Sequence, residues 1–106
     1  MMQIQINTDK NIEGGESLAT RVSSIVEGAL SHFNDHITRV EVHLSDENGP
    51  KDGQDDKRCM MEVRLKGRQP VAVTFQAATL SEAIDGAADK MKKHIETVLG
   101  RLQDHH

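Results

Sequence analysis

The fold of this chain is decided by residues 79–102, which read TLSEAIDGAADKMKKHIETVLGRL. Apolar residues recur there at intervals of three or four, which predicts one long amphipathic helix. The stripe consists of Leu80, Ile84, Ala87, Ala88, Met91, Ile95, Val98, Leu99 and Leu102. Thr79 and Glu82 have the spacing of a capping box, so the helix is expected to start there. Its polar positions include the cations Lys90, Lys92, Lys93 and Arg101.

Upstream, four stretches alternate apolar and polar residues, the pattern of strands with one buried face: 3–8, 39–44, 59–66 and 71–76. A second amphipathic stretch, with Ser17 as N-cap and an end near Asn34, predicts a helix after the first strand. Its stripe is Leu18, Val22, Ile25, Val26, Ala29, Leu30 and Phe33. The connections are expected to be a turn at 11–15, a long polar loop at 46–57 and a short hairpin connection at 67–70.

The expected order is therefore strand, helix, three strands, helix. Two apolar helix stripes and one apolar sheet face can close a single core. The sequence predicts an α+β two-layer sandwich in β-α-β-β-β-α order. Both helices are expected on one face of a four-stranded, mainly antiparallel sheet, with the other face in water.

Length and composition indicate one domain, residues 1–106, with no membrane partner. The sequence has no apolar run long enough to cross a bilayer, and its alternating start is unlike a signal peptide. The single cysteine, Cys59, excludes an internal disulfide and favours a cytoplasmic location. With two Phe and no Tyr or Trp, recognition of bases by aromatic stacking is not expected.

Catalytic and metal-binding motifs are weak. Cys59 falls on an apolar strand face, as a core residue does, and no nucleophile–base set or phosphate-binding glycine loop is recognisable. We therefore predict no enzyme activity, no cofactor and no small-molecule substrate. His32, His36 and His43 could hold zinc, but no further ligand has a recognisable spacing, so a metal site stays a third hypothesis. The acidic 46–57 loop fails the calcium-loop pattern at Pro50 and Lys57.

Further cations follow the predicted sheet: Arg39, Arg64, Lys66 and Arg68. The net charge of -4 argues against a nucleic-acid binder, although the local distribution of charge matters more than the sum. On the last helix, Asp89 can pair with Lys93 and Lys92 with Glu96 at i, i+4. The pattern leaves two interpretations open: a solvated surface of mixed charge, or a phosphate-binding face.

Three segments resemble the short ribosome hibernation promoting factors, a family that includes the ribosome-associated inhibitor, also called sigma modulation protein or ribosomal subunit interface protein. They are MQIQI at 2–6, ITRVEVHL at 37–44 and, most distinctively, AIDGAADKMKK at 83–93. The resemblance covers nearly the whole chain. It implies a fold similar to the double-stranded-RNA-binding domain.

The resemblance also implies a function. Such factors bind the small ribosomal subunit in the decoding channel and stop translation under stress or in stationary phase, by occupancy and without catalysis. The basic residues of the family's last helix match Lys90 and Lys93 here, which share a helix face. The expected contacts to ribosomal RNA are Lys90 and Lys93, then Lys92, Arg101, Arg39, Arg64 and Lys66.

The first helix departs from the family pattern, because its expected basic residues are reduced to Arg21. Fewer phosphate contacts predict weaker and less salt-sensitive RNA binding. The alternative function is therefore a protein-binding regulatory module of the same fold that has lost ribosome binding. We also expect a short form, because the 106 residues end too early for the C-terminal dimerisation domain of the long family members.

Overall fold

The computed structural model describes residues 3–9, 12, 15–46 and 57–103, with side chains up to Gly100. Its elements confirm the predicted order. They are β1 (Gln3–Thr8), α1 (Glu16–Leu30), the 3-10 helix η1 (Ser31–His36), β2 (Ile37–Asp46), β3 (Lys57–Leu65), β4 (Val71–Ala77) and α2 (Leu80–Gln103).

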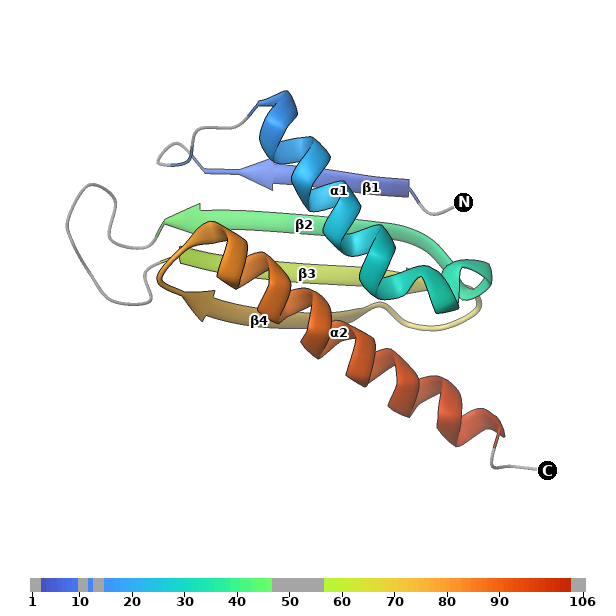
Figure 1. The fold of residues 1–106 in the computed structure, drawn as a ribbon. Coiled ribbons are helices and arrows are strands. Elements are labelled where there is room, and N and C mark those ends of the chain that lie inside the picture. The colour runs from blue at the N-terminus through green and yellow to red at the C-terminus, as the bar shows by residue number, and fades with distance from the viewer. Residues whose placement is uncertain (1–2, 10–11, 13–14, 47–56, 104–106) are drawn as a thin grey trace.

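The sheet has the strand order β1-β2-β3-β4. β1 runs parallel to β2, because α1 carries the chain back across the sheet between them. The β2–β3 and β3–β4 pairs are antiparallel. Both helices lie on the same face of the sheet (Figure 1). The predicted α+β sandwich with a mainly antiparallel sheet is therefore confirmed.

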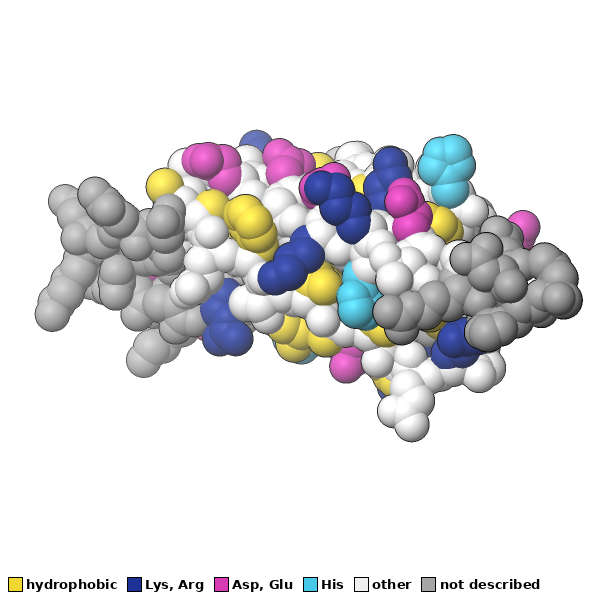
Figure 2. Space-filling view, turned by 90° about the horizontal axis from the view of Figure 1, so that it is seen from below, with side chains coloured by type: hydrophobic (Ala, Val, Ile, Leu, Met, Phe, Trp, Pro, Cys, Tyr) yellow, Lys and Arg dark blue, Asp and Glu magenta, His cyan; other side chains and the backbone are white. Residues whose placement is uncertain are grey.

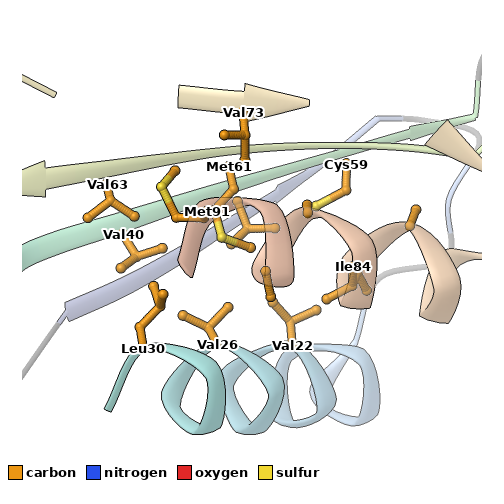
Figure 3. Close-up of a cluster of buried hydrophobic side chains, with 14 of the residues drawn as sticks. Val22, Val26, Leu30, Val40, Cys59, Met61, Val63, Val73, Ile84 and Met91 are labelled. Carbon is orange, nitrogen blue, oxygen red and sulfur yellow. The ribbon is translucent and has the colours of Figure 1, made fainter. Parts of the chain in front are cut away.

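A single core fills the space between the sheet and the helices (Figure 3). Val22, Val26 and Leu30 of α1 are fully buried, as the predicted stripe requires. Alternate residues of β2 and β3 point to the same core, while their neighbours form the outer sheet face. On α2, the buried positions are Ala83, Ile84, Ala87, Ala88, Met91 and Ile95.

The start of α2 is capped as predicted. The Thr79 hydroxyl oxygen accepts a hydrogen bond from the Glu82 backbone N–H at 3.1 Å. The same hydroxyl donates to the Glu82 carboxylate at 3.0 Å. The Thr79 hydroxyl thus satisfies the Glu82 N–H of the first helical turn, and the Glu82 carboxylate binds this hydroxyl instead of the Thr79 backbone N–H of a full capping box.

The prediction for the first helix was wrong at both ends. α1 begins at Glu16 after Gly15, and no side chain caps it, so Ser17 is not the N-cap. α1 ends at Leu30, and the residues up to His36 form η1 instead. Ser31, Asn34 and Asp35 favour turns over helix interiors, and the tighter turns lead directly into β2.

The central strands are longer than predicted at the 46–57 connection. Asp46 and Lys57 are cross-strand neighbours, and the Lys57 ammonium lies 3.3 Å from the Asp46 carboxylate. The backbone N–H of Asp46 also donates to the Asp9 carboxylate at 3.1 Å. These contacts extend the β2–β3 pairing to the polar residues Asp46 and Lys57. Residues 47–56 of the predicted loop, with its failed calcium pattern, and most of the predicted 11–15 turn lie outside the described residues.

Candidate nucleic-acid interface

Lys90 lies where α2 passes over the outermost strand, β4. Its ammonium group donates to the backbone carbonyl of Thr74 at 3.1 Å. One turn earlier, the ring of Phe75 lies against Gly86, where a Cβ would be only 2.3 Å from two ring carbons. This side of α2 is therefore fixed to β4, and one of the three ammonium donors of Lys90 is in use.

Lys93 is on the same side of α2 as Lys90 but is paired with an acid, and Lys92 lies apart from both. The Lys93 ammonium lies 3.1 Å from the Asp89 carboxylate, and both side chains are well exposed, so the predicted i, i+4 pair forms but is weak. The predicted Lys92–Glu96 pair is absent from the ion pairs of the described residues. Since each residue turns the helix by about 100°, Lys92 lies on the opposite flank of α2 from Lys90.

Arg101 lies in the last turn of α2, where no side chain is described. On the side of the molecule formed by β4 and α2, Lys and Arg are interspersed with Asp and Glu, as Figure 2 shows. The helix cations therefore form a mixed-charge surface rather than a continuous basic patch.

The sheet cations, in contrast, are brought together. Arg39 and Arg64 are cross-strand neighbours on the outer face, next to an irregularity in the β2–β3 register between Ile37 and Arg39. Thr38 has no partner in the β2–β3 register, and its side-chain hydroxyl donates to the Arg64 carbonyl at 3.1 Å. Such bulges redirect side chains at the end of a strand pair.

Arg39 is committed to neighbours in the sheet. Its guanidinium donates to the side-chain oxygen of Gln5 and to the Glu41 carboxylate, the latter at 3.4 Å. Its Nε is buried without a hydrogen-bond partner. Arg64 and Lys66, by comparison, are exposed and use no side-chain donor within the described part of the chain.

An open hollow of ≈ 550 Å³ lies beside these two residues. It is lined by Thr38, Arg64, Leu65 and the turn residues 66–69, and we call it the hairpin hollow. Arg68 is a third cation in its lining, and it was not among the RNA contacts predicted from the sequence. The alternation of Arg64, Lys66 and Arg68 at every second position was the pattern that could have indicated it.

The turn itself requires glycine. The Arg68 backbone N–H donates to the Leu65 carbonyl at 3.3 Å, which closes a four-residue turn. Gly67, at the third position, has a φ of 67°, the left-handed conformation that type II turns place there. The backbone N–H of Lys66 donates to the His36 carbonyl at 2.8 Å, so the hollow is anchored to the end of η1.

The remaining candidates do not form a reactive site. His32 and His36 lie in η1 and His43 lies on β2, and among the described residues no three His, Cys, Asp or Glu side chains are grouped to hold a metal. Cys59 is buried, and loss of hydration raises the pKa of its thiol to about 12. None of the described helices has the length and apolar character that crossing a membrane requires.

Comparison with known proteins agrees with this architecture. The family model described as sigma 54 modulation protein / S30EA ribosomal protein matches residues 4–103. The N-terminal domain of Protein Y from Thermus thermophilus is similar in structure, with 23% identity and a TM-score of 0.74, over 92% of this chain and 99% of that chain. A ribosomal subunit interface protein from Coxiella burnetii has 14% identity and a TM-score of 0.68, over 94% of this chain and 99% of that chain. A search of curated proteins finds no match.

Proposed function

Because the chain belongs to the sigma 54 modulation protein / S30EA ribosomal protein family, we propose that it binds the small ribosomal subunit and inhibits translation. Proteins of this family are ribosome-associated factors and not enzymes. In this proposal the chain occupies the decoding channel of the small subunit and thereby blocks translation. It does so in the cytoplasm, under stress or in stationary phase. The match over residues 4–103 carries this proposal.

The geometry supports contacts from two surfaces. On α2, the exposed Lys90 and Lys93 lie about one turn apart and can meet neighbouring phosphates. Their present partners, a carbonyl group and a surface carboxylate, are exchangeable at low cost. On the sheet, Arg39, Arg64 and Lys66 provide the second group, and Lys92 and Arg101 complete the proposed set. Phosphate contacts of this kind position a protein on RNA without reading its sequence.

Co-sedimentation of the purified chain with ribosomes and separated subunits, at low and moderate salt, tests the function. Binding to the small subunit that weakens as salt rises is the expected result, because phosphate contacts release counterions. Absence of binding to either subunit, even at low salt, would overturn the proposal.

The helix residues are tested by Lys90→Glu combined with Lys93→Glu, which should abolish co-sedimentation with the small subunit. The matched control is Arg21→Glu combined with Arg58→Glu, which changes the net charge equally at positions outside the proposed set. If the two double variants sediment alike, the assignment of Lys90 and Lys93 is wrong even where the wild-type chain binds.

A protein-binding regulatory module is the second candidate, favoured by the single cation of α1. Arg21 is already engaged there, since its guanidinium donates to the Ser81 hydroxyl at 3.2 Å. The dependence of binding on salt separates the two functions. A steep log–log slope indicates phosphates, whereas an apolar protein interface gives a shallow one.

A further inference from the structure

The hairpin hollow differs from the other basic positions because the stretch of sequence that forms most of it has no Asp or Glu that could pair with its cations. Between Glu62 and Glu82 the chain has three cations, Arg64, Lys66 and Arg68, and no Asp or Glu. All three line the same hollow. On α2, by contrast, Asp85, Asp89 and Glu96 alternate with the lysines. An anion in the hollow therefore meets no carboxylate among the lining residues, and the nearest acid along η1 is Asp35, next to His36.

The donors of the hollow are also available. The side chains of Arg64, Lys66 and Arg68 make no hydrogen bond or ion pair with any part of the chain that the structure describes. Lys90, Lys93 and Arg39 do have such partners. Binding an anion in the hollow breaks no existing side-chain contact of these three residues. The two guanidinium groups can each bind phosphate oxygens with two parallel N–H donors, and the Lys66 ammonium adds a compact positive charge with three donors.

The backbone gives the hollow a fixed shape. The Thr38 bulge forms its β2 side, and the Gly67 turn forms its tip. The Lys66 N–H···His36 carbonyl bond and the Thr38 hydroxyl bond to the Arg64 carbonyl hold the two sides together. These bonds fix the backbone of the lining, so that binding an anion has to order only the exposed side chains of Arg64, Lys66 and Arg68.

The direction of approach follows from the neighbouring acids. Glu41 and Glu62 are cross-strand neighbours and form the next pair along the outer face beyond Arg39 and Arg64. Their carboxylates repel an anion that lies across the middle of the sheet. An anionic ligand is therefore favoured at the hairpin end of the molecule, and the open hollow admits a group that is part of a longer polymer.

We propose that the hairpin hollow binds phosphate groups of an RNA backbone, with Arg64, Lys66 and Arg68 as the contacting side chains. This adds the β3–β4 turn, with Arg68, to the contacts that α2 is proposed to make with RNA. The choice of RNA rests on the proposed function, whereas the phosphate chemistry rests on the hollow alone. A free phosphate compound is the other source of the same chemistry.

The phosphate site is tested with inorganic phosphate and pyrophosphate, titrated into the isotope-labelled full chain while its amide resonances are followed by NMR. Saturable shifts are expected for Thr38 and residues 64–69, and not for Arg21 or Arg58. The double variant Lys66→Gln with Arg68→Gln should lose these shifts while keeping the dispersed spectrum of a folded chain. Shifts that do not saturate, or that survive in this variant, would overturn the site.

The RNA assignment is tested with a fluorescent single-stranded RNA oligonucleotide, by anisotropy at several salt concentrations. The slope of log affinity against log salt should fall by about 1.4 in the Lys66→Gln/Arg68→Gln variant, since each lost contact is worth about 0.7. The control, Arg21→Gln with Arg58→Gln, removes the same charge and should keep the slope. Equal slopes in the two variants would overturn the assignment of RNA as the ligand of the hollow.

The outcomes separate this proposal from the proposed function. Phosphate-dependent shifts and the slope change, without co-sedimentation of the wild-type chain, would support the hollow and overturn ribosome binding. Co-sedimentation that is unaffected by Lys66→Gln/Arg68→Gln would overturn the hollow and leave ribosome binding standing. Phosphate-dependent shifts with an unchanged RNA slope would assign the hollow to a free phosphate compound instead of RNA.

Discussion

Gly86 shows how one residue sets the fit of α2 on the sheet, because the ring of Phe75 occupies the space of its missing side chain. In Gly86→Ala the new Cβ would lie 2.3 Å from two ring carbons. The ring must move, and we expect the free energy of unfolding to fall by roughly 1–3 kcal/mol, despite the better helix propensity of Ala. Urea unfolding followed by circular dichroism measures this change.

Gly28→Ala is the matched control, since Gly28 also lies in a helix but has open space around its Cβ position. It should raise the free energy of unfolding by about 0.5–1 kcal/mol. Combining Gly86→Ala with Phe75→Ala should remove most of the Gly86→Ala penalty, as coupled neighbours do. A penalty that persists without the ring would show that the contact with Phe75 is not its cause.

Cys59 illustrates the effect of burial on a single ionisable group. Its pKa is raised to about 12 from an ordinary 9.0 because the buried thiolate would lose its hydration. The folded state thus keeps the thiol proton that the unfolded state releases above pH 9. The stabilising contribution is complete below pH 9 and is lost as the pH rises towards 12, on the order of 1 kcal/mol by pH 10.

Two measurements check the Cys59 prediction. The difference in unfolding free energy between the wild-type chain and Cys59→Ala should shrink between pH 8 and pH 10. A thiol reagent at pH 8 should label Cys59 only after denaturation, because the thiolate is the reactive form. Rapid labelling of the native chain would contradict the burial argument.

At the scale of the sheet, the outer face carries a repulsive pair. Glu41 and Glu62 stand opposite each other, but only Glu41 is bound to a cation, at 3.4 Å from Arg39. Glu62→Gln removes the repulsion and breaks no side-chain hydrogen bond or ion pair within the part of the chain that the structure describes. We expect it to stabilise the chain by about 0.2–1 kcal/mol, whereas Glu41→Gln should not, because it loses the Arg39 pair. Thermal unfolding at low salt compares the two, and the gain should diminish at high salt.

Among the elements, those defined by local periodicity were predictable. The apolar stripe and capping box placed α2 within one residue at each end, 79–102 against Leu80–Gln103. The same periodicity failed at the end of α1, because Phe33 continues the stripe although the backbone has tightened into η1. The extra length of β2 and β3 comes from the Asp46–Lys57 contact between strands, which no local pattern contains.

For the molecule as a whole, the distribution of charge outweighs its sum. α2, at 24 residues, spans about 36 Å, whereas the 7 residues of β4 span about 24 Å. The last turns of α2 therefore extend past the sheet, at the same end as the β3–β4 turn (Figure 1). The acids Asp9, Asp46 and Glu82 lie towards the other end. A chain with a net charge of -4 can thus still gather the cations Arg64, Lys66 and Arg68 at one turn.

The sequence could list the cations, but it could not show which of them are already engaged by other parts of the chain. Lys90 and Arg39 are engaged by Thr74 and Gln5, residues from other elements, and such partners are invisible before the chain is folded. The hairpin hollow depends on the Thr38 bulge, which exists only once β2 and β3 pair. The identity of the basic residues was therefore predictable, and their availability was not.

The contact between Lys90 and the Thr74 carbonyl has a consequence for solubility. β4 ends the sheet, and a bare row of backbone groups on a terminal strand is a template on which a second chain can add. Lys90 hydrogen-bonds the Thr74 carbonyl and places a charge beside this strand, and charged side chains at terminal strands disfavour edge-to-edge pairing. Charge reversal at Lys90 uncovers this strand as well as removing a cation. The state of association of each Lys90 variant therefore decides whether lost ribosome binding reports on RNA or on chains that have joined edge to edge.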